Sequence, residues 1–221
     1  LAHLNFTELR IVNMGVISNG TTLLDAGAID SGVATGSLIH IKTLTASSSG
    51  TLSFVHGSAN VVLDGTYKEY IFKYINIHPA SVAQLTFNLS IDSGSNYNIT
   101  KTTTAHNSYM NENGSSPGMV YRTAWDLAQS TNFQIMAQEL GNGADESGCG
   151  YLHLYDPANT SKVKQFMGTT TYHQTFGANG SFQVYYGGYG NTTSAVNAVQ
   201  FKMSSGNIDS GLIKLYGVKP S

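Results

Sequence analysis

The sequence predicts an all-β fold, an antiparallel two-sheet sandwich of jelly-roll type with an extended N-terminal arm. Segments that alternate apolar and polar residues recur at a spacing of roughly 8–15 residues, which is typical of such folds. Clusters of Gly, Ser, Asn and Asp separate these segments and indicate turns. The length of 221 residues fits a single all-β domain.

The first 36 residues differ from the rest of the chain. Their apolar residues keep no sustained period, and glycine recurs too often for a long regular element. We therefore expect residues 1–36 to form an extended arm and residues 37–221 to form the sandwich. The apolar side chains need burial, so the arm is predicted to anchor the domain to a neighbouring subunit or a larger assembly. The alternative is an irregular edge of the main domain. The candidate anchoring residues are Leu4, Phe6, Leu9, Ile11 and Val12.

Two hairpins are predicted at the start of the sandwich. Residues 38–45 and 51–56 form the first, with a turn between them, and residues 84–91 and 97–104 form the second. Strict alternation in residues 84–91 divides that strand into two faces. The predicted inward residues are Leu85, Phe87, Leu89 and Ile91, and the predicted outward residues are Thr86, Asn88 and Ser90.

Residues 67–77 show the strongest strand pattern. Both faces are apolar, which is typical of a central strand, and His78-Pro79 ends it because proline cannot donate to a sheet ladder. The two faces carry Tyr70, Phe72 and Tyr74, and Ile71, Ile75 and Ile77. Further strands are predicted at 119–126, 133–137, 151–155, 162–173, 181–189, 196–203 and 212–218, with one helical turn within 124–130.

Charge and cysteine content exclude several function classes. Only 11% of residues are charged and the net charge is -2, so clustered cations for nucleic-acid phosphates are lacking. One cysteine excludes a disulfide framework within the chain and a cysteine-based zinc site. No apolar run approaches the roughly 20 residues of a membrane helix, and we expect no membrane insertion.

The titratable residues show no catalytic motif. The histidines lack the H-x-x-x-H spacing of a helical metal site. Two histidine–carboxylate contacts are possible from the spacing: His106 with Glu112 across a turn, and His153 with Asp156. Asp145 and Glu146 are adjacent, so they would point to opposite sides of an extended chain, and a solvated acidic loop explains them. The sequence therefore predicts a non-enzymatic protein without cofactor or metal.

Tyrosine is the most informative residue type, with 13 in the chain. Its apolar ring and polar tip suit subunit interfaces and sugar-stacking surfaces. Tyr185, Tyr186 and Tyr189 form the candidate interaction surface, and ordinary core and rim positions are the alternative. With so little charge, much neutral surface is left for a partner, so we expect a homo-oligomer.

Three stretches of the chain are distinctive. They are residues 67–80 (YKEYIFKYINIHPA), the combination of 125–131 (WDLAQST), 141–145 (GNGAD) and 150–157 (GYLHLYDP), and residues 191–217 (NTTSAVNAVQFKMSSGNIDSGLIKLYG). These stretches resemble small structural proteins of marine tailed bacteriophages. The third is the most specific because its strand-turn-strand spacing is long and continuous. The resemblance implies a protein on the surface of the virion, and it implies no catalytic residues.

The expected function is therefore that of a virion structural protein, a component of a tail fibre or receptor-binding appendage. A capsid decoration or cement protein on the phage head is the first alternative. A carbohydrate-binding module or glycan hydrolase is the second. Expected partners are other virion proteins, further copies of the chain and a glycan of the host surface. A trimer is favoured only by analogy with phage appendages.

Overall fold

The computed structural model describes residues 16–18, 21–25, 28–29, 37–174 and 179–219. Contacts divide the chain into two compact units, Leu1–Ser37 and Leu38–Ser221. In the first unit, three short strands form a small antiparallel sheet in the order β1-β2-β3. They are β1 (Val16–Ser18), β2 (Thr21–Asp25) and β3 (Ala28–Ile29).

The second unit is built from twelve strands that form one hydrogen-bonded sheet, and every strand pair is antiparallel. In its described part the only helical element is the 3-10 turn η1 (Thr123–Trp125). The prediction of an all-β antiparallel fold is confirmed. The strands are β4 (Leu38–Thr45), β5 (Leu52–Val55), β6 (Glu69–Pro79), β7 (Ala83–Ser90), β8 (Lys101–Asn111), β9 (Gly118–Tyr121), β10 (Gln134–Leu140), β11 (Gly148–Tyr155), β12 (Lys164–Gln174), β13 (Gly180–Gly190), β14 (Ala198–Met203) and β15 (Ile208–Val218).

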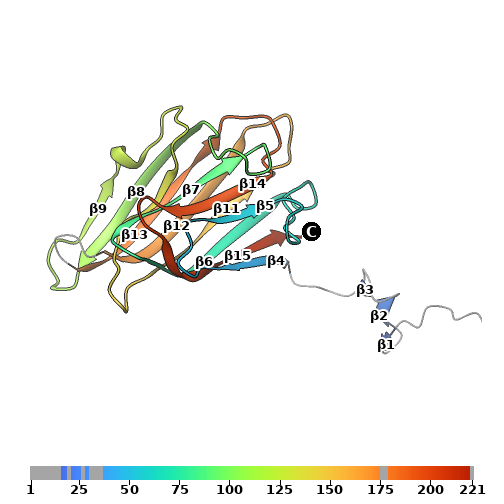
Figure 1. Ribbon diagram of the computed structural model, residues 1–221, viewed down its shortest axis with the longest axis horizontal. Helices are drawn as coiled ribbons and strands as arrows, with labels where there is room; N and C mark the ends of the chain where they lie inside the picture. The colour runs from blue at the N-terminus through green and yellow to red at the C-terminus, as the bar shows by residue number, and fades with distance from the viewer. Residues whose placement is uncertain (1–15, 19–20, 26–27, 30–36, 175–178, 220–221) are drawn as a thin grey trace, which may run out of the picture. The chain divides into compact units, whose positions relative to one another are not determined.

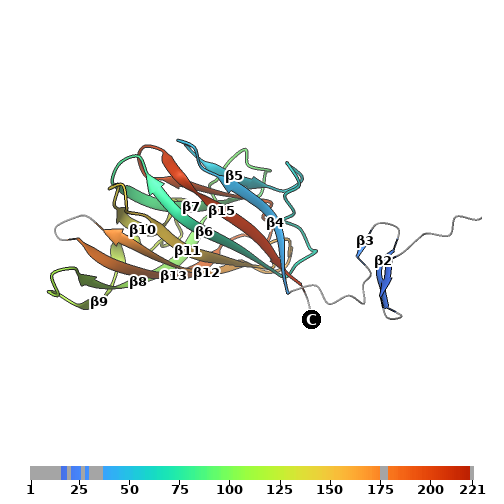
Figure 2. The same cartoon turned by 90° about the horizontal axis from the view of Figure 1, so that it is seen from below.

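The sheet is nearly closed into a barrel-like shape (Figures 1 and 2). Strands β4-β15-β6-β11-β12-β13-β8-β9 follow one another as neighbours, and β10-β7-β14-β5 form the rest of the sheet. The two runs are joined between β10 and β12 by a single residue pair, Leu140 with Gln174. The core lies between them.

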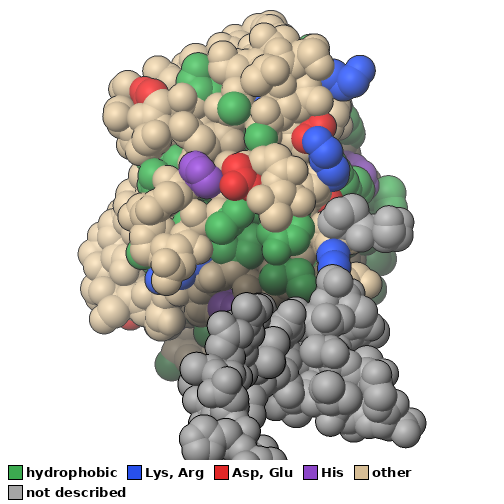
Figure 3. All heavy atoms as spheres, turned by 90° about the vertical axis from the view of Figure 1, so that its right-hand side faces the viewer, with side chains coloured by type: hydrophobic (Ala, Val, Ile, Leu, Met, Phe, Trp, Pro, Cys, Tyr) green, Lys and Arg blue, Asp and Glu red, His purple; other side chains and the backbone are tan. Residues whose placement is uncertain are grey.

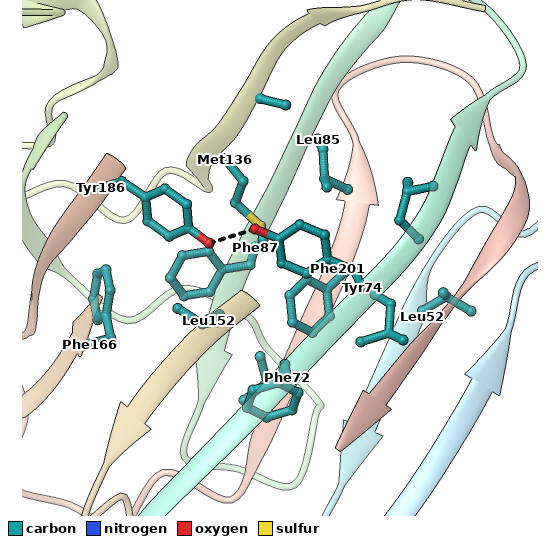
Figure 4. Packing of buried hydrophobic residues seen from close by; sticks show 14 of the residues in the cluster. Leu52, Phe72, Tyr74, Leu85, Phe87, Met136, Leu152, Phe166, Tyr186 and Phe201 are labelled. Carbon is teal, nitrogen blue, oxygen red and sulfur yellow. Dashed lines mark hydrogen bonds between the residues drawn. The ribbon is translucent and has the colours of Figure 1, made fainter. Parts of the chain in front are cut away.

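Aromatic rings from both runs fill this core (Figure 4). Phe54 of β5 packs edge-on against Phe72 of β6, with ring centroids 5.3 Å apart. Phe87 of β7 packs edge-on against Phe166 of β12, at 5.1 Å. All four side chains are buried. Removing such rings from water is the main force that brings the two runs together.

Strand β6 has β15 and β11 as its neighbours, so its predicted central position is confirmed. The prediction for Ile77 is wrong, because this residue is fully buried on the same face as Tyr74. Asn76 adopts φ 51° and the pairing register of β15 shifts beside it, so the strand carries a bulge. A bulge adds one residue to the strand and reverses the alternation beyond it.

Neither predicted N-terminal hairpin forms. Strand β4 pairs with β15 and β5 pairs with β14. Strand β7 pairs with β10 and β14, whereas β8 pairs with β13 and β9. The intervening turns carry the chain from one run of the sheet to the other. Turn residues therefore show where a strand ends but do not determine its partner.

In β7, Leu85, Phe87 and Leu89 lie in the core as predicted, but the residues predicted to face outward are not exposed to solvent. Thr86, Asn88 and Ser90 are buried, while Ile91, just beyond the strand, is 40% exposed. The neighbouring segments cover the polar face, and Asn88 Nδ2 donates to the Tyr97 and Thr131 carbonyl oxygens at 2.7 and 2.9 Å. These hydrogen bonds satisfy the amide after its burial.

Charged side chains are sparse on the molecular surface. On the face drawn in Figure 3, lysine, arginine and acidic side chains are few and scattered, and most of the surface belongs to uncharged polar groups and backbone. This agrees with the charged fraction of 11%.

Candidate binding face

The outer face of the sheet, turned away from the core, carries a row of aromatic side chains. The registers of β9, β8, β13, β12 and β11 place Tyr121, His106, Tyr185, Thr169 and Tyr151 opposite one another. Directly opposed residues of antiparallel strands project to the same face. We call Tyr121, His106, Tyr185 and Tyr151 the aromatic row.

The aromatic row is open to solvent. Tyr121, Tyr185 and Tyr151 are 56%, 41% and 40% exposed. The rings of His106 and Tyr185 stack with centroids 5.2 Å apart and planes inclined by 13°. In this stack each ring covers part of one face of the other, and the remaining surface of Tyr185 is open to solvent.

A groove lies next to the aromatic row, toward the end of β13 at Gly180. In register, Ser181 of β13 stands between Met110 of β8 and His173 of β12. The small serine leaves space there, and the exposed Met110 borders it. The cavity has a volume of about 700 Å³ and adjoins a smaller one of about 250 Å³. We call it the β13 groove; Met110, Thr171 and Ser181 line both parts, with Glu112 and His173 in the larger and Gln183 in the smaller.

His173 lies between two carboxylates beside this groove. Its Nε2 is 3.2 Å from Glu112 Oε1, and its Nδ1 is 2.9 Å from Glu146 Oε1, although the second contact lacks hydrogen-bond geometry. Glu146 Oε2 also accepts from the Gly143 amide at 2.6 Å. The predicted meeting of His106 with Glu112 does not occur, because His106 is stacked on Tyr185.

The other predicted histidine contact is likewise replaced. His153 hydrogen-bonds to Glu69 of the neighbouring strand β6, while Asp156 pairs with Lys68 at 3.0 Å. His153 also lies between the rings of Tyr151 and Tyr155 on the outer face. Partners across the sheet take precedence over partners close in sequence, because opposed side chains are held at contact distance.

The three tyrosines of the predicted interaction surface do not lie on the same face of the sheet. Tyr185 is exposed and Tyr189 is partly buried, and alternation places both on the outer face. Tyr186 does not belong to this surface: it is 3% exposed and points into the core. Consecutive strand residues point to opposite faces of a sheet, so Tyr185 and Tyr186 could not both belong to one surface. The predicted anchoring residues Leu4, Phe6, Leu9, Ile11 and Val12 lie outside the described residues.

Buried hydroxyl groups fix β12 beneath the aromatic row. Tyr74 Oη lies 2.7 Å from the Thr169 carbonyl oxygen and 2.7 Å from Thr170 Oγ1. It also lies 3.3 Å from Tyr186 Oη (Figure 4). Burial raises the pKa of the Tyr74 phenol well above its usual value. Gly168 leaves room for this cluster, since a Cβ there would clash with Tyr186 Oη and would lie 2.6 Å from the Tyr151 carbonyl oxygen.

Two lysines that the sequence pattern did not single out are fully buried at the end of β13 near Gly190. Lys101 of β8 and Lys164 of β12 flank Gly190 in register. Lys101 Nζ donates to Asn88 Oδ1 at 2.5 Å and to the Ile99 carbonyl oxygen at 2.8 Å. Burial lowers the pKa of Lys101 to about 7. Their surroundings depend on strand pairing, which the sequence pattern did not reveal.

The described residues contain no cluster of three or more His, Cys, Asp or Glu suited to a metal ion. Among the helices of that same part of the chain, none is long and apolar enough to cross a membrane. No protein-family model, curated protein or solved structure matches the chain.

Proposed function

We propose that the chain is a non-enzymatic structural protein of a bacteriophage virion, in a tail fibre or receptor-binding appendage. The observation that carries the proposal is the solvent-exposed aromatic row on an antiparallel sheet. Tyrosines in such a position provide contact area with little loss of side-chain entropy on binding. The resemblance of residues 67–80 and 191–217 to phage structural proteins supplies the setting.

The strand pairs support a jelly-roll form of the sheet. Four pairs are nested in the chain: β4 with β15, β5 with β14, β6 with β11, and β7 with β10. A long hairpin of nested pairs that is rolled up gives the two facing sheets of a jelly roll. The β8–β9 and β12–β13 hairpins are then insertions that widen one sheet. Jelly rolls recur in viral capsid proteins and lectins, an analogy at the level of fold alone.

The small sheet β1-β2-β3 supports a proposed anchoring role for residues 1–36. Its strands have three, five and two residues, so few hydrogen bonds between strands stabilise it as an independent sheet. Docking on a neighbouring subunit or another virion protein would complete that pairing. Deleting residues 1–36 should leave a folded domain that no longer joins the particle. Unfolding of the truncated chain, or its normal incorporation, would refute this role.

The neutral outer face also supports assembly into a homo-oligomer, for which a trimer is the analogy-based expectation. Light scattering of the purified full chain at micromolar concentration measures its mass in solution. A mass of three chains would support the trimer, and a strictly monomeric chain would refute self-assembly in solution.

The decisive test of the proposed function is the location of the protein in the particle. Antibody raised against the full chain should label the tail or its appendages in electron micrographs of the phage that encodes it. Labelling over the head would instead establish the decoration-protein alternative. Purified particles that lack the chain, as judged by mass spectrometry, would refute both locations.

A further inference from the structure

We propose that the β13 groove and the adjacent aromatic row form a binding site for a neutral oligosaccharide. The inference rests on the proposed receptor-binding role and gives it a place and a ligand class. The groove volume of about 700 Å³ falls within the range of small-ligand sites. It therefore suits a short saccharide rather than a folded protein surface.

The aromatic row supplies the apolar part of the recognition. A pyranose ring has one face covered by C–H groups, and such a face packs on an aromatic plane. Tyr185 is 41% exposed and stacks on His106, so the open part of its ring is available for such packing beside the groove. Gly187 follows on the same face, with the exposed Met167 as its register partner on β12. A saccharide is able to extend from the groove over these rings.

The groove supplies neutral hydrogen-bonding groups. Ser181 and Thr171 contribute hydroxyl groups, and Gln183 contributes an amide, all from outward positions of β13 and β12. Saccharide hydroxyl groups both donate and accept, as these side chains do. These groups thus offer hydrogen-bonding partners to a polyhydroxylated ligand.

Charge selects among polyhydroxylated ligands. Among the described residues that line the larger part of the groove, Glu112 is the only carboxylate, and its side chain is 64% exposed. Its carboxylate is able to accept hydrogen bonds from vicinal hydroxyl groups. The same carboxylate repels sulfated and uronic-acid chains and the phosphates of nucleic acids. The site should therefore prefer neutral saccharides to anionic ones.

The site also rests on a rigid support. Strand β13 is paired along its whole length with β12 and β8, and the Tyr74 hydroxyl cluster fixes β12 from below. A preformed surface loses little conformational entropy when a ligand binds. Weak stacking and hydrogen-bonding contacts then suffice for measurable affinity.

Affinity electrophoresis of the full chain in native gels tests the proposal. The probes are dextran, mannan and galactomannan as neutral polysaccharides, and alginate as the anionic one. Two variants disrupt the site: Tyr185→Ala removes the stacking ring, and Ser181→Phe fills the groove. Two matched controls alter exposed or partly exposed outer-face positions elsewhere on the sheet, Tyr216→Ala on β15 and Gln165→Phe on β12.

At least one neutral polysaccharide should retard the wild-type chain, and both site variants should bind it about tenfold more weakly or worse. Both controls should bind like the wild type, provided that all chains show the same thermal unfolding. No retardation by the three neutral polymers, retardation by alginate alone, or unchanged binding of both site variants would overturn the proposal. Such a failure would leave the location of the protein in the particle, which electron microscopy tests separately, unaffected.

Discussion

Replacing the buried lysine at the start of β8 should change how stability depends on pH. Lys101 is fully buried, and two neutral oxygens accept its hydrogen bonds. Burial lowers its pKa from 10.5 to about 7, because the charged form loses its hydration. The folded chain therefore binds fewer protons than the unfolded chain between these two pH values. Its free energy of unfolding must rise with pH in that range.

The size of the effect follows from the two pKa values. At pH 7.5 the unfolded lysine is protonated and the folded lysine is largely neutral, and the difference persists up to pH 9. Lys101 alone should raise the free energy of unfolding by about 2 kcal/mol between pH 7.5 and 9. The variant Lys101→Met keeps the apolar stem but carries no proton, so it should lack this increase.

Urea unfolding at 25 °C, followed by fluorescence of the single buried Trp125, measures the free energy at each pH. Lys73→Met on the exposed surface of β6 is the control and should keep the wild-type increase. The reasoning is refuted if the wild type gains no stability between pH 7.5 and 9, or if Lys101→Met gains as much.

Three further predictions concern the core. Gly168→Ala should lower the free energy of unfolding in urea by roughly 1–3 kcal/mol, because the new Cβ would meet the Tyr151 carbonyl oxygen. The control Gly187→Ala should change that free energy by no more than about 0.5 kcal/mol, because no atom lies closer than 3.4 Å to its Cβ. Phe87→Ala should lower the free energy of unfolding by about 3–5 kcal/mol through the cavity it leaves, and an equal loss from exposed Met119→Ala would contradict this account. Above about pH 10 stability should fall again, because burial keeps tyrosines such as Tyr74 neutral in the folded chain while they ionise when unfolded; a continued rise in an alkaline titration would exclude this.

The sequence predicted the strands better than their partners. Alternation located β4, β5, β7 and β14, because placing one face of a strand in the core imposes period two locally. It did not predict that β4 pairs with β15, since pairing between distant segments depends on the closure of the whole sheet. The bulge at Asn76 likewise left no pattern in the sequence, and it moved Ile77 into the core.

The candidate site was predictable only in part. Tyr185 was found from composition and clustering, and stricter use of alternation would have excluded Tyr186. The groove was not predictable, because it exists only where register places small Ser181 between Met110 and His173. The same holds for His173 and Glu112, which meet because β12 and β8 both pair with β13.

The residues of the proposed binding site and the residues of the core lie on opposite faces of the same hairpins. The groove and most of the aromatic row lie on the β8–β9 and β12–β13 hairpins, which are insertions in the proposed jelly roll. The outer face of these hairpins is free to vary, because its side chains do not contribute to the core. The inner face of these hairpins is not free to vary, since Phe166 and Tyr186 pack against Phe87. Changes in the proposed saccharide preference should therefore arise at alternate residues of β13 and β8, while the residues between them stay fixed by packing.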